Sequence, residues 1–431
     1  MAIPSISPAT VSTAQRVAGG AAPKAAPAAA PAEASSEPKD TFQASTPQVT
    51  GSWLAGQLKN TKPGAMFVLD DFQPTGGQAI PGPFAGPEWL ASHGGAVLDT
   101  AKKEGFPGQT IPLEINRPLS DDQLQQKYGQ MTELWNNGKT PEDLRKSLYE
   151  RALVNRTRLL DNATESLNDL SGAGAHDSVV NISASGTQAA TVDRLLKRMV
   201  PTDRENPESV AAARAERAKF AQAFGVSDAD LSSDNADVQG AARQKMFQGV
   251  VDLVAQTQTD PNFVSSKAAY EGAVTRFEGG NNSVVVAAGN EGGVQKFWED
   301  ATSGRSLKVP ADFTRNDLGS SEATVVGATR DWKGQAYPAE YNNSFQGVDV
   351  YANGYAHDGS PKADEGTSYA APRVASAMGG LHGKFPGMSS SQIENLMRQQ
   401  LTGSLPDYYG SQVLPVLDEK HTMDFLAQGT F

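Results

Sequence analysis

The chain has 431 residues, a formal net charge of −12 and only 38% hydrophobic residues. Nucleic acids and anionic membrane surfaces attract clusters of Lys and Arg, and the sequence has no such cluster, so we expect neither as a partner. Because the chain has no Cys, disulfides, thiolate catalysis and Cys-ligated zinc are excluded.

The beginning of the chain predicts no folded structure. Residues 1–50 are rich in Ala, Pro and Ser and have almost no aromatic side chains to bury, so we predict a disordered N-terminal tail. This segment lacks the basic, apolar and small-residue regions of a Sec signal peptide. No apolar stretch approaches the roughly 20 residues of a membrane-spanning helix. Cytoplasmic action and export by another route both stay open, as does the oligomeric state.

Beyond residue 50 the chain alternates between two kinds of apolar pattern. Short apolar runs bounded by Gly and Asp predict buried strands at 65–70, 177–185, 282–290, 323–328 and 348–354. Longer amphipathic patterns predict helices at 141–170, 208–225, 241–258 and 266–280. This alternation predicts an α/β fold, in which a mostly parallel central sheet carries helices on both faces.

Polar residues with complementary chemistry follow these runs. Asp70 and Asp71 end the first run, His93 opens a Gly-rich helix, Asn290 ends the third run, and Ser368 lies where a Gly-rich loop enters a helix. A serine hydroxyl becomes nucleophilic when an imidazole removes its proton, and a carboxylate holds that imidazole in the right tautomer. An Asn amide can donate to the developing oxyanion. Together these residue types indicate acyl transfer.

Four motifs in this order resemble the subtilisin-like serine protease (subtilase) family. GTSYAAPRVA at 366–375 is similar to the nucleophile box, and His93-Gly94 is similar to the His box. VVNISAS at 179–185 and VVVAAGNEG at 284–292 are similar to the strand that lines the substrate and the strand that carries the oxyanion Asn. The resemblance covers most of residues 60–400 and implies a peptidase domain over 51–431.

The resemblance implies a serine endopeptidase that works through an acyl-enzyme intermediate. Ser368 would be the nucleophile, His93 the general base, Asp70 the residue that orients His93, and Asn290 the oxyanion donor. The Asp box departs from the family pattern, because this chain has Asp70-Asp71-Phe72 where Asp is usually followed by Ser or Thr and Gly. Asp71 is therefore kept as the alternative carboxylate. The substrates would be peptides or proteins, catalysis would need no cofactor, and structural calcium is left open.

The resemblance also implies the walls of a primary specificity pocket. One wall would be Ser183, Ala184, Ser185 and Gly186, and the other Ala287, Ala288 and Gly289. Ser185 stands where the family commonly has Gly, and its hydroxymethyl group would narrow the cleft.

Two segments, near 105–175 and 188–262, are longer than the family core and rich in helix formers. We expect helical insertions on the helical layer of the sheet, with a lid over the cleft as the alternative for the second segment. Two other functions stay open. One is an impaired pseudo-protease that binds peptides without cleaving them, which the altered Asp box favours. The other is a serine hydrolase or peptide ligase that uses the same triad.

Overall fold

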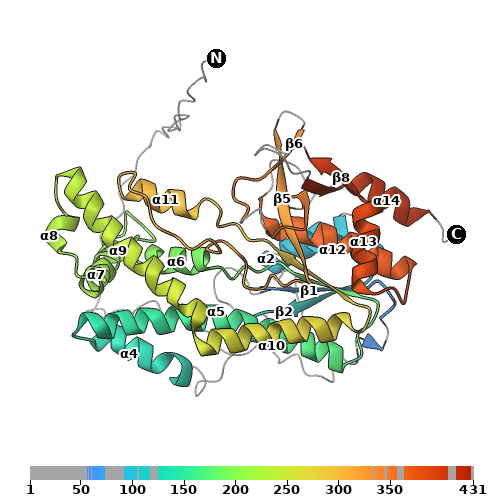
Figure 1. Cartoon of the computed structure of the whole chain (residues 1–431), viewed down its shortest axis with the longest axis horizontal. Helices are drawn as coiled ribbons and strands as arrows, with labels where there is room; N and C mark the ends of the chain where they lie inside the picture. The colour runs from blue at the N-terminus through green and yellow to red at the C-terminus, as the bar shows by residue number, and fades with distance from the viewer. Residues whose placement is uncertain are drawn as a thin grey trace, which may run out of the picture. The chain divides into compact units, whose positions relative to one another are not determined.

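A single nine-stranded sheet forms the centre of the fold (Figure 1). The computed structural model describes residues 56, 58, 59, 61–72, 92–103, 106–116, 125–332, 335–343, 347–356, 364–405 and 414–428. The tail predicted at 1–50 lies outside these residues. Along the sheet the strands follow the order β2-β1-β3-β4-β5-β7-β9-β8, and β6 pairs with β5.

Every predicted strand is present, with somewhat different ends. They are β1 (Met66–Asp70), β3 (Val179–Ile182), β4 (Ser283–Ala287), β5 (Thr324–Trp332) and β7 (Val350–Asn353). These five strands pair in parallel with one another. Strands that are buried on both faces read as continuous apolar runs, which is why the sequence pattern located them. The predicted α/β fold with a mostly parallel sheet is confirmed.

The sheet contains further strands at β2 (Thr110–Glu114), β6 (Gln335–Pro338), β8 (Thr402–Leu405) and β9 (Leu414–Leu417). The pairs β5–β6 and β8–β9 are antiparallel. Strand β2 corrects the segment 105–175, whose first part is sheet rather than helical insertion. Only Ile111 and Leu113 of β2 are buried, and Pro112 weakens the strand pattern. Proline is tolerated here because β2 is an edge strand.

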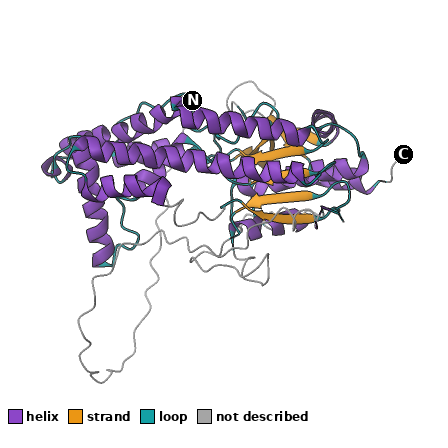
Figure 2. Cartoon of the chain, turned by 90° about the horizontal axis from the view of Figure 1, so that it is seen from below, coloured by secondary structure: helices purple, strands orange, loops and turns teal. Residues whose placement is uncertain are grey.

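Two helical layers cover the sheet, as Figure 2 shows for helices on both sides of the strands. Met66 and Val68 of β1 face one layer, formed by α2 (His93–Lys103), α12 (Thr367–Lys384), α13 (Ser390–Gln400) and α14 (Glu419–Ala427). Phe67 and Leu69 face the other, formed by α5 (Pro141–Gly172) and α10 (Pro261–Glu278). The alternation follows from the two-residue period of a strand.

The inserted helices form a third core of their own beyond the sheet, at the left of Figure 1. Its aromatic residues include Trp135, Phe220 and Trp298, and the first two meet edge to face with ring centroids 5.3 Å apart. The first half of α5 also contributes to this core. Thr140 caps the N-terminus of α5 and Pro141 is its first residue, so the helix begins within this core and not at the sheet. The helices involved are α4 (Gln130–Asn137), α6 (Gln188–Lys197), α7 (Pro207–Ala223), α8 (Asp228–Leu231), α9 (Ala236–Gln256) and α11 (Val294–Ala301).

These additions differ from the expected layer of surface helices, because they bury their apolar faces against one another. Two short turns complete the elements, the π-helical η2 (Gln125–Gly129) and the 3₁₀ turn η3 (Thr257–Thr259). Within the part of the chain that the structure describes, none of the helices combines the length and apolarity needed to cross a membrane.

Candidate active site

Asp70 and His93 are joined by a hydrogen bond at the carboxyl end of β1. Asp70 is the last residue of β1 and His93 is the first residue of α2. His93 Nδ1 lies 2.7 Å from Asp70 Oδ1, which also accepts the backbone N–H of Asp71 at 2.6 Å. The Asp70 side chain is only 3% exposed, whereas that of His93 is 42% exposed. With Nδ1–H donating to Asp70, Nε2 is left as the proton acceptor on the accessible side of the ring.

Asp71, the alternative carboxylate, has a different place in this arrangement. Its backbone N–H donates to Asp70, and its carbonyl oxygen accepts the N–H of Gly94 at 2.8 Å. These bonds tie the end of β1 to the first turn of α2. Asp71 thus supports the geometry of the Asp70–His93 pair through its backbone and adds a negative charge nearby.

The pKa of His93 is raised above its ordinary value. Burial alone would lower this pKa, but the hydrogen bond with Asp70 and the negative charges of Asp70 and Asp71 outweigh it. A base with a raised pKa takes up a proton more readily and holds it more firmly.

Glu114 is a neighbouring carboxyl group that the sequence did not single out. It ends β2, directly beside Asp70 in the parallel register. Its oxygens accept the backbone N–H groups of Phe72 at 2.9 Å and Asn116 at 2.7 Å. Burial raises the pKa of Glu114 to about 8, although these hydrogen bonds act in the opposite direction. The sequence could have indicated Glu114 only as an acidic residue at the end of a strand, and strand β2 was not predicted.

Ser368 lies in the first turn of α12, where the early N–H groups of a helix have no acceptor within the helix. Pro372 lacks an N–H, so it leaves the carbonyl oxygen of Ser368 without its usual helical donor. The hydroxyl of Ser183 fills this place and donates to that oxygen at 3.0 Å. The hydroxyl of Ser368 donates in turn to the carbonyl oxygen of Ser183 at 3.1 Å. Among the described contacts none is a hydrogen bond between Ser368 and His93, and the hydroxyl is instead bonded to the Ser183 carbonyl.

Asn290 follows the end of β4 and its amide has one defined orientation. Its Oδ1 accepts the backbone N–H of Thr367 at 2.8 Å and the Thr367 hydroxyl at 3.0 Å. A backbone N–H can only donate, so the atom that faces it must be the oxygen. Thr367 Oγ1 also accepts the N–H of Gly289 at 3.0 Å, which fixes the threonine. The Asn290 NH₂ group is therefore turned away from Thr367 and is available as a donor.

Three of the predicted residues line one open pocket of about 590 Å³, namely His93, Asn290 and Ser368. Asp70 lies buried behind His93. The rest of the lining was not predicted and consists of Arg330, Tyr355, Asp364, Glu365, Gly366 and Tyr369. Arg330 Nε pairs with Glu365 Oε2 at 2.9 Å, so one wall of the pocket carries charge of both signs. Among the residues that line this pocket in the described structure, none comes from the second insertion, which was the proposed lid.

The residues expected to wall the specificity pocket lie at the ends of two neighbouring strands. Residues 183–186 follow β3, and Ala287–Gly289 end or follow the parallel strand β4. They lie outside the lining of the pocket described above. Ala184 and Ser185 are partly exposed and the others are buried.

The hydroxyl of Ser185 is held at the edge of these strand ends. It donates to Glu291 Oε2 at 3.0 Å, and the same oxygen accepts the Asn343 amide at 2.6 Å. Gly289 has φ +101, and a Cβ there would overlap the side chains of Asn343 and Ser185. Glycine at 289 therefore lets the two strand ends approach each other. Glu291 directly follows Asn290 in the sequence, whereas Asn343 is distant from it, and the sequence singled out neither residue.

The sequence left open whether the protein binds a structural calcium ion. Among the described residues, no three or more His, Asp or Glu side chains gather closely enough to hold one. Structural calcium stays an expectation without assigned ligands.

A buried Asp bonded to an accessible His, a serine at a helix N-terminus and an Asn amide beside the same pocket are the parts of a serine hydrolase. Residues 204–413 match the model described as the subtilase family, which confirms for this part of the chain the family that the motifs predicted. The matched stretch contains Asn290 and Ser368, whereas Asp70 and His93 precede it. A comparison with curated proteins finds no match.

The solved structures that match this chain have low sequence identity to it and low TM-scores. A cold-adapted subtilisin-like serine proteinase is 13% identical, with 83% of this chain and 89% of that chain covered and a TM-score of 0.37. The nisin leader peptidase NisP from Lactococcus lactis is 13% identical, with 87% and 91% covered and a TM-score of 0.37. MycP1 from Mycobacterium smegmatis is 14% identical, with 86% and 83% covered and a TM-score of 0.36. Likeness at this level assigns no role to any residue.

Proposed function

We propose that this chain is a subtilisin-like serine endopeptidase that cleaves peptide or protein substrates through Asp70, His93 and Ser368. The observation that carries the proposal is the 2.7 Å contact between Asp70 and His93, because His93 lines one pocket together with Ser368 and Asn290. The raised pKa of His93 is consistent with a base that an adjacent carboxylate supports.

In the proposed reaction, rotation of the Ser368 side chain breaks its bond to the Ser183 carbonyl and brings the hydroxyl to His93 Nε2. His93 takes the proton as Ser368 Oγ attacks the scissile carbonyl, and Asp70 stabilises the imidazolium that forms. The Asn290 NH₂ group and the backbone N–H of Ser368 donate to the oxyanion. His93 then gives its proton to the leaving amine. Water hydrolyses the acyl-enzyme by the same steps in reverse, and catalysis needs no cofactor.

One observation favours a second function, a pseudo-protease that binds peptides without cleaving them. The Ser368 hydroxyl is bonded to Ser183 and not to His93. A serine hydroxyl moves by rotation about one bond, and hydrogen bonds in a site without substrate are often looser than in the reacting complex. The endopeptidase is therefore the better-supported reading. A serine hydrolase or peptide ligase would use the same groups on other acyl acceptors.

The test is cleavage of an unfolded protein such as casein by the purified chain and by a matched Ser368→Ala variant. Both are also treated with a serine-reactive fluorophosphonate. We expect cleavage and labelling of the native chain only, with cleavage blocked by the reagent. A folded native chain that neither cleaves nor labels would leave the peptide-binding function ahead. Ester hydrolysis or ligation without endoproteolysis would favour the third function.

A further inference from the structure

The loop that precedes β5 joins the ends of the two strands expected to hold the substrate. Asn316 uses its whole amide for this purpose. Its Oδ1 accepts the N–H groups of Gly186 at 3.1 Å and Leu318 at 3.0 Å. Its Nδ2 donates to the carbonyl oxygens of Ala184 at 3.3 Å and Ala287 at 2.7 Å. The side chain is 5% exposed, so this one amide bridges β3 and β4 inside the protein.

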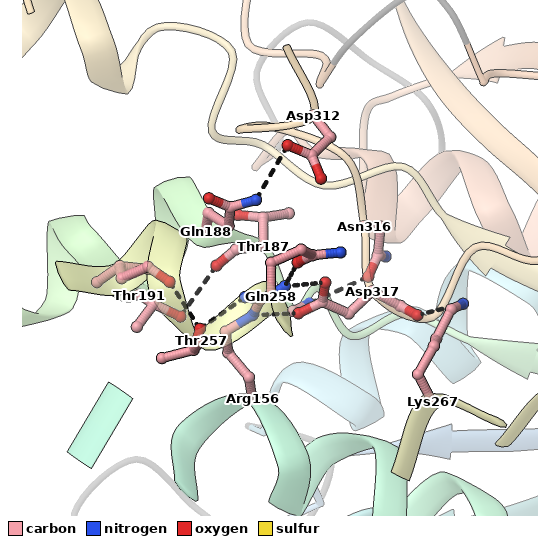
Figure 3. Close-up of polar contacts among 12 residues, drawn as sticks. Arg156, Thr187, Gln188, Thr191, Thr257, Gln258, Lys267, Asp312, Asn316 and Asp317 are labelled. Atoms are coloured by element: carbon pink, nitrogen blue, oxygen red, sulfur yellow. Dashed lines mark hydrogen bonds and ion pairs between the residues drawn. The ribbon is translucent and has the colours of Figure 1, made fainter. Parts of the chain in front are cut away.

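Asp317, the next residue, connects the same loop to an inserted helix. Its backbone N–H donates to the carbonyl oxygen of Gly186 at 2.5 Å. Its carboxylate accepts two hydrogen bonds from Arg156 of α5. Arg156 Nε donates to Oδ2 at 2.8 Å, and Nη2 donates to Oδ1 at 2.6 Å. Figure 3 shows Arg156 extending from α5 to Asp317. Such a two-pronged pair fixes orientation as well as distance.

Arg156 is fully enclosed, and two of its other N–H groups also donate hydrogen bonds. The residue is 1% exposed, and it donates to Thr257 Oγ1 at 2.8 Å and to Gln258 Oε1 at 2.6 Å. Its guanidinium lies 4.0 Å from the ring centroid of Phe263. A single side chain thus connects α5, the turn before α10, α10 itself and the loop at the strand ends. No lysine could reproduce this planar set of bonds.

A second helix holds the same loop. Lys267 of α10 donates through Nζ to the carbonyl oxygens of Asp317 at 2.8 Å and Gly319 at 2.6 Å. The loop is consequently clamped between α5 and α10 on one side and the ends of β3 and β4 on the other (Figure 3). None of these residues lines the pocket that contains His93 and Ser368 in the described structure.

We propose that Arg156 is a positioning residue, which acts through Asp317 and Asn316 to set the distance between the substrate-lining ends of β3 and β4. The inserted part of α5 therefore controls how the protein binds the side chain on the acyl side of the scissile bond. The groups that carry out the chemistry have other supports, namely Asp70 for His93 and Thr367 for Asn290. The expected change in KM rests on the proposed endopeptidase function, whereas the expected change in the geometry of the strand ends does not.

The test compares Arg156→Lys and Asn316→Ala with the native chain. The first keeps the positive charge and loses the two-pronged geometry, and the second removes the bridge itself. For peptides with a large residue before the scissile bond we expect KM to rise about tenfold, since misplacement by about 1 Å can cost more than that. We expect kcat and the rate of fluorophosphonate labelling to stay within about twofold. Backbone amide exchange in residues 183–188 should rise in both variants.

Leu148→Ala is the matched control, because Leu148 is a buried residue of the same helix in the separate helical core. We expect it to lower the thermal midpoint without changing KM or exchange at residues 183–188. The inference is wrong if Arg156→Lys leaves both readouts at the native value, or if Leu148→Ala shifts them equally. If Arg156→Lys does not fold, unchanged exchange in Asn316→Ala overturns the inference by itself. A native chain that neither cleaves nor labels would refute the proposed function, whereas the exchange data would still decide the positioning role.

Discussion

Replacing Asp70 by Asn tests which of the two adjacent carboxylates supports His93. Asp70 Oδ1 accepts both the Asp71 N–H and His93 Nδ1, and Oδ2 is buried without a hydrogen-bond partner among the described residues. The Asn side chain therefore has a preferred orientation. If its NH₂ group replaced Oδ1, it would face the Asp71 N–H, and two donors would meet. We expect Asn Oδ1 to stay in place, so that His93 keeps its tautomer and loses only the neighbouring charge.

The size of the effect follows from that lost charge. Two unit charges about 4 Å apart interact by about 4 kcal/mol at an effective dielectric constant of about 20. The imidazolium that forms in the proposed reaction loses this stabilisation, which corresponds to about a 10³-fold lower kcat. Asp71→Asn removes a charge that raises the pKa of His93 less than Asp70 does and without the hydrogen bond that Asp70 makes, so its effect should stay below about tenfold.

Cleavage of a fluorogenic peptide across pH 5 to 9 measures both effects. The neutral form of His93 is the base, so kcat/KM rises with pH as His93 loses its proton. Asp70 raises the pKa of His93 against the effect of burial. In Asp70→Asn this limb should move to lower pH while the plateau falls. A larger loss in Asp71→Asn than in Asp70→Asn would refute the assignment of Asp70.

Three further outcomes are expected from residues around the site. Thr367→Val removes one of the two donors that hold Asn290 Oδ1, and kcat should fall by about tenfold with KM nearly unchanged, as steady-state kinetics would show; an equal rise in KM would contradict this role. Burial raises the pKa of Glu114 from 4.5 to about 8. Between these two pH values the folded chain keeps a proton that the unfolded chain releases, so the stability of the fold falls as the pH rises from 4.5 to about 8. In a Ser368→Ala background the thermal midpoint should therefore drop by several degrees between pH 5 and 8, and less so with Glu114→Gln, whereas equal slopes would contradict the argument. Ser185→Gly removes the hydroxymethyl group that bonds to Glu291 and should raise kcat/KM for peptides with a large residue before the scissile bond relative to those with Ala; an unchanged ratio would show that Ser185 does not narrow the cleft.

The sequence predicted the central strands and the groups at their ends for the same physical reason. A strand that is buried on both faces is apolar throughout, and the polar residue that follows it stands out. Asp70 at the end of β1 and Asn290 after β4 are two such residues. Strand β2 was missed because only Ile111 and Leu113 are buried in a run of five residues that contains Pro112.

Contacts that depend on the packing of distant segments could not be predicted in this way. Arg156 and Asp317 are 161 positions apart and meet only because α5 packs beneath the loop before β5. Glu365 and Arg330 similarly meet in the wall of the pocket without a local motif. The position of the Ser368 hydroxyl also depends on a distant segment. It donates to the carbonyl oxygen of Ser183, which follows β3.

The supports of the proposed catalytic groups and those of the strand ends proposed to line the substrate are separate in this fold. Asp70 holds His93, Thr367 holds Asn290, and both bonds lie within the region of the sheet that the family motifs describe. The strand ends are instead tied through Asn316 and Asp317 to Arg156, which belongs to an inserted helix. A change in the insertion can thus alter the width between β3 and β4 without moving the imidazole or the oxyanion donor. Insertions that build a core of their own would then act on the choice of substrate, while the rate of the chemical step would stay with the sheet.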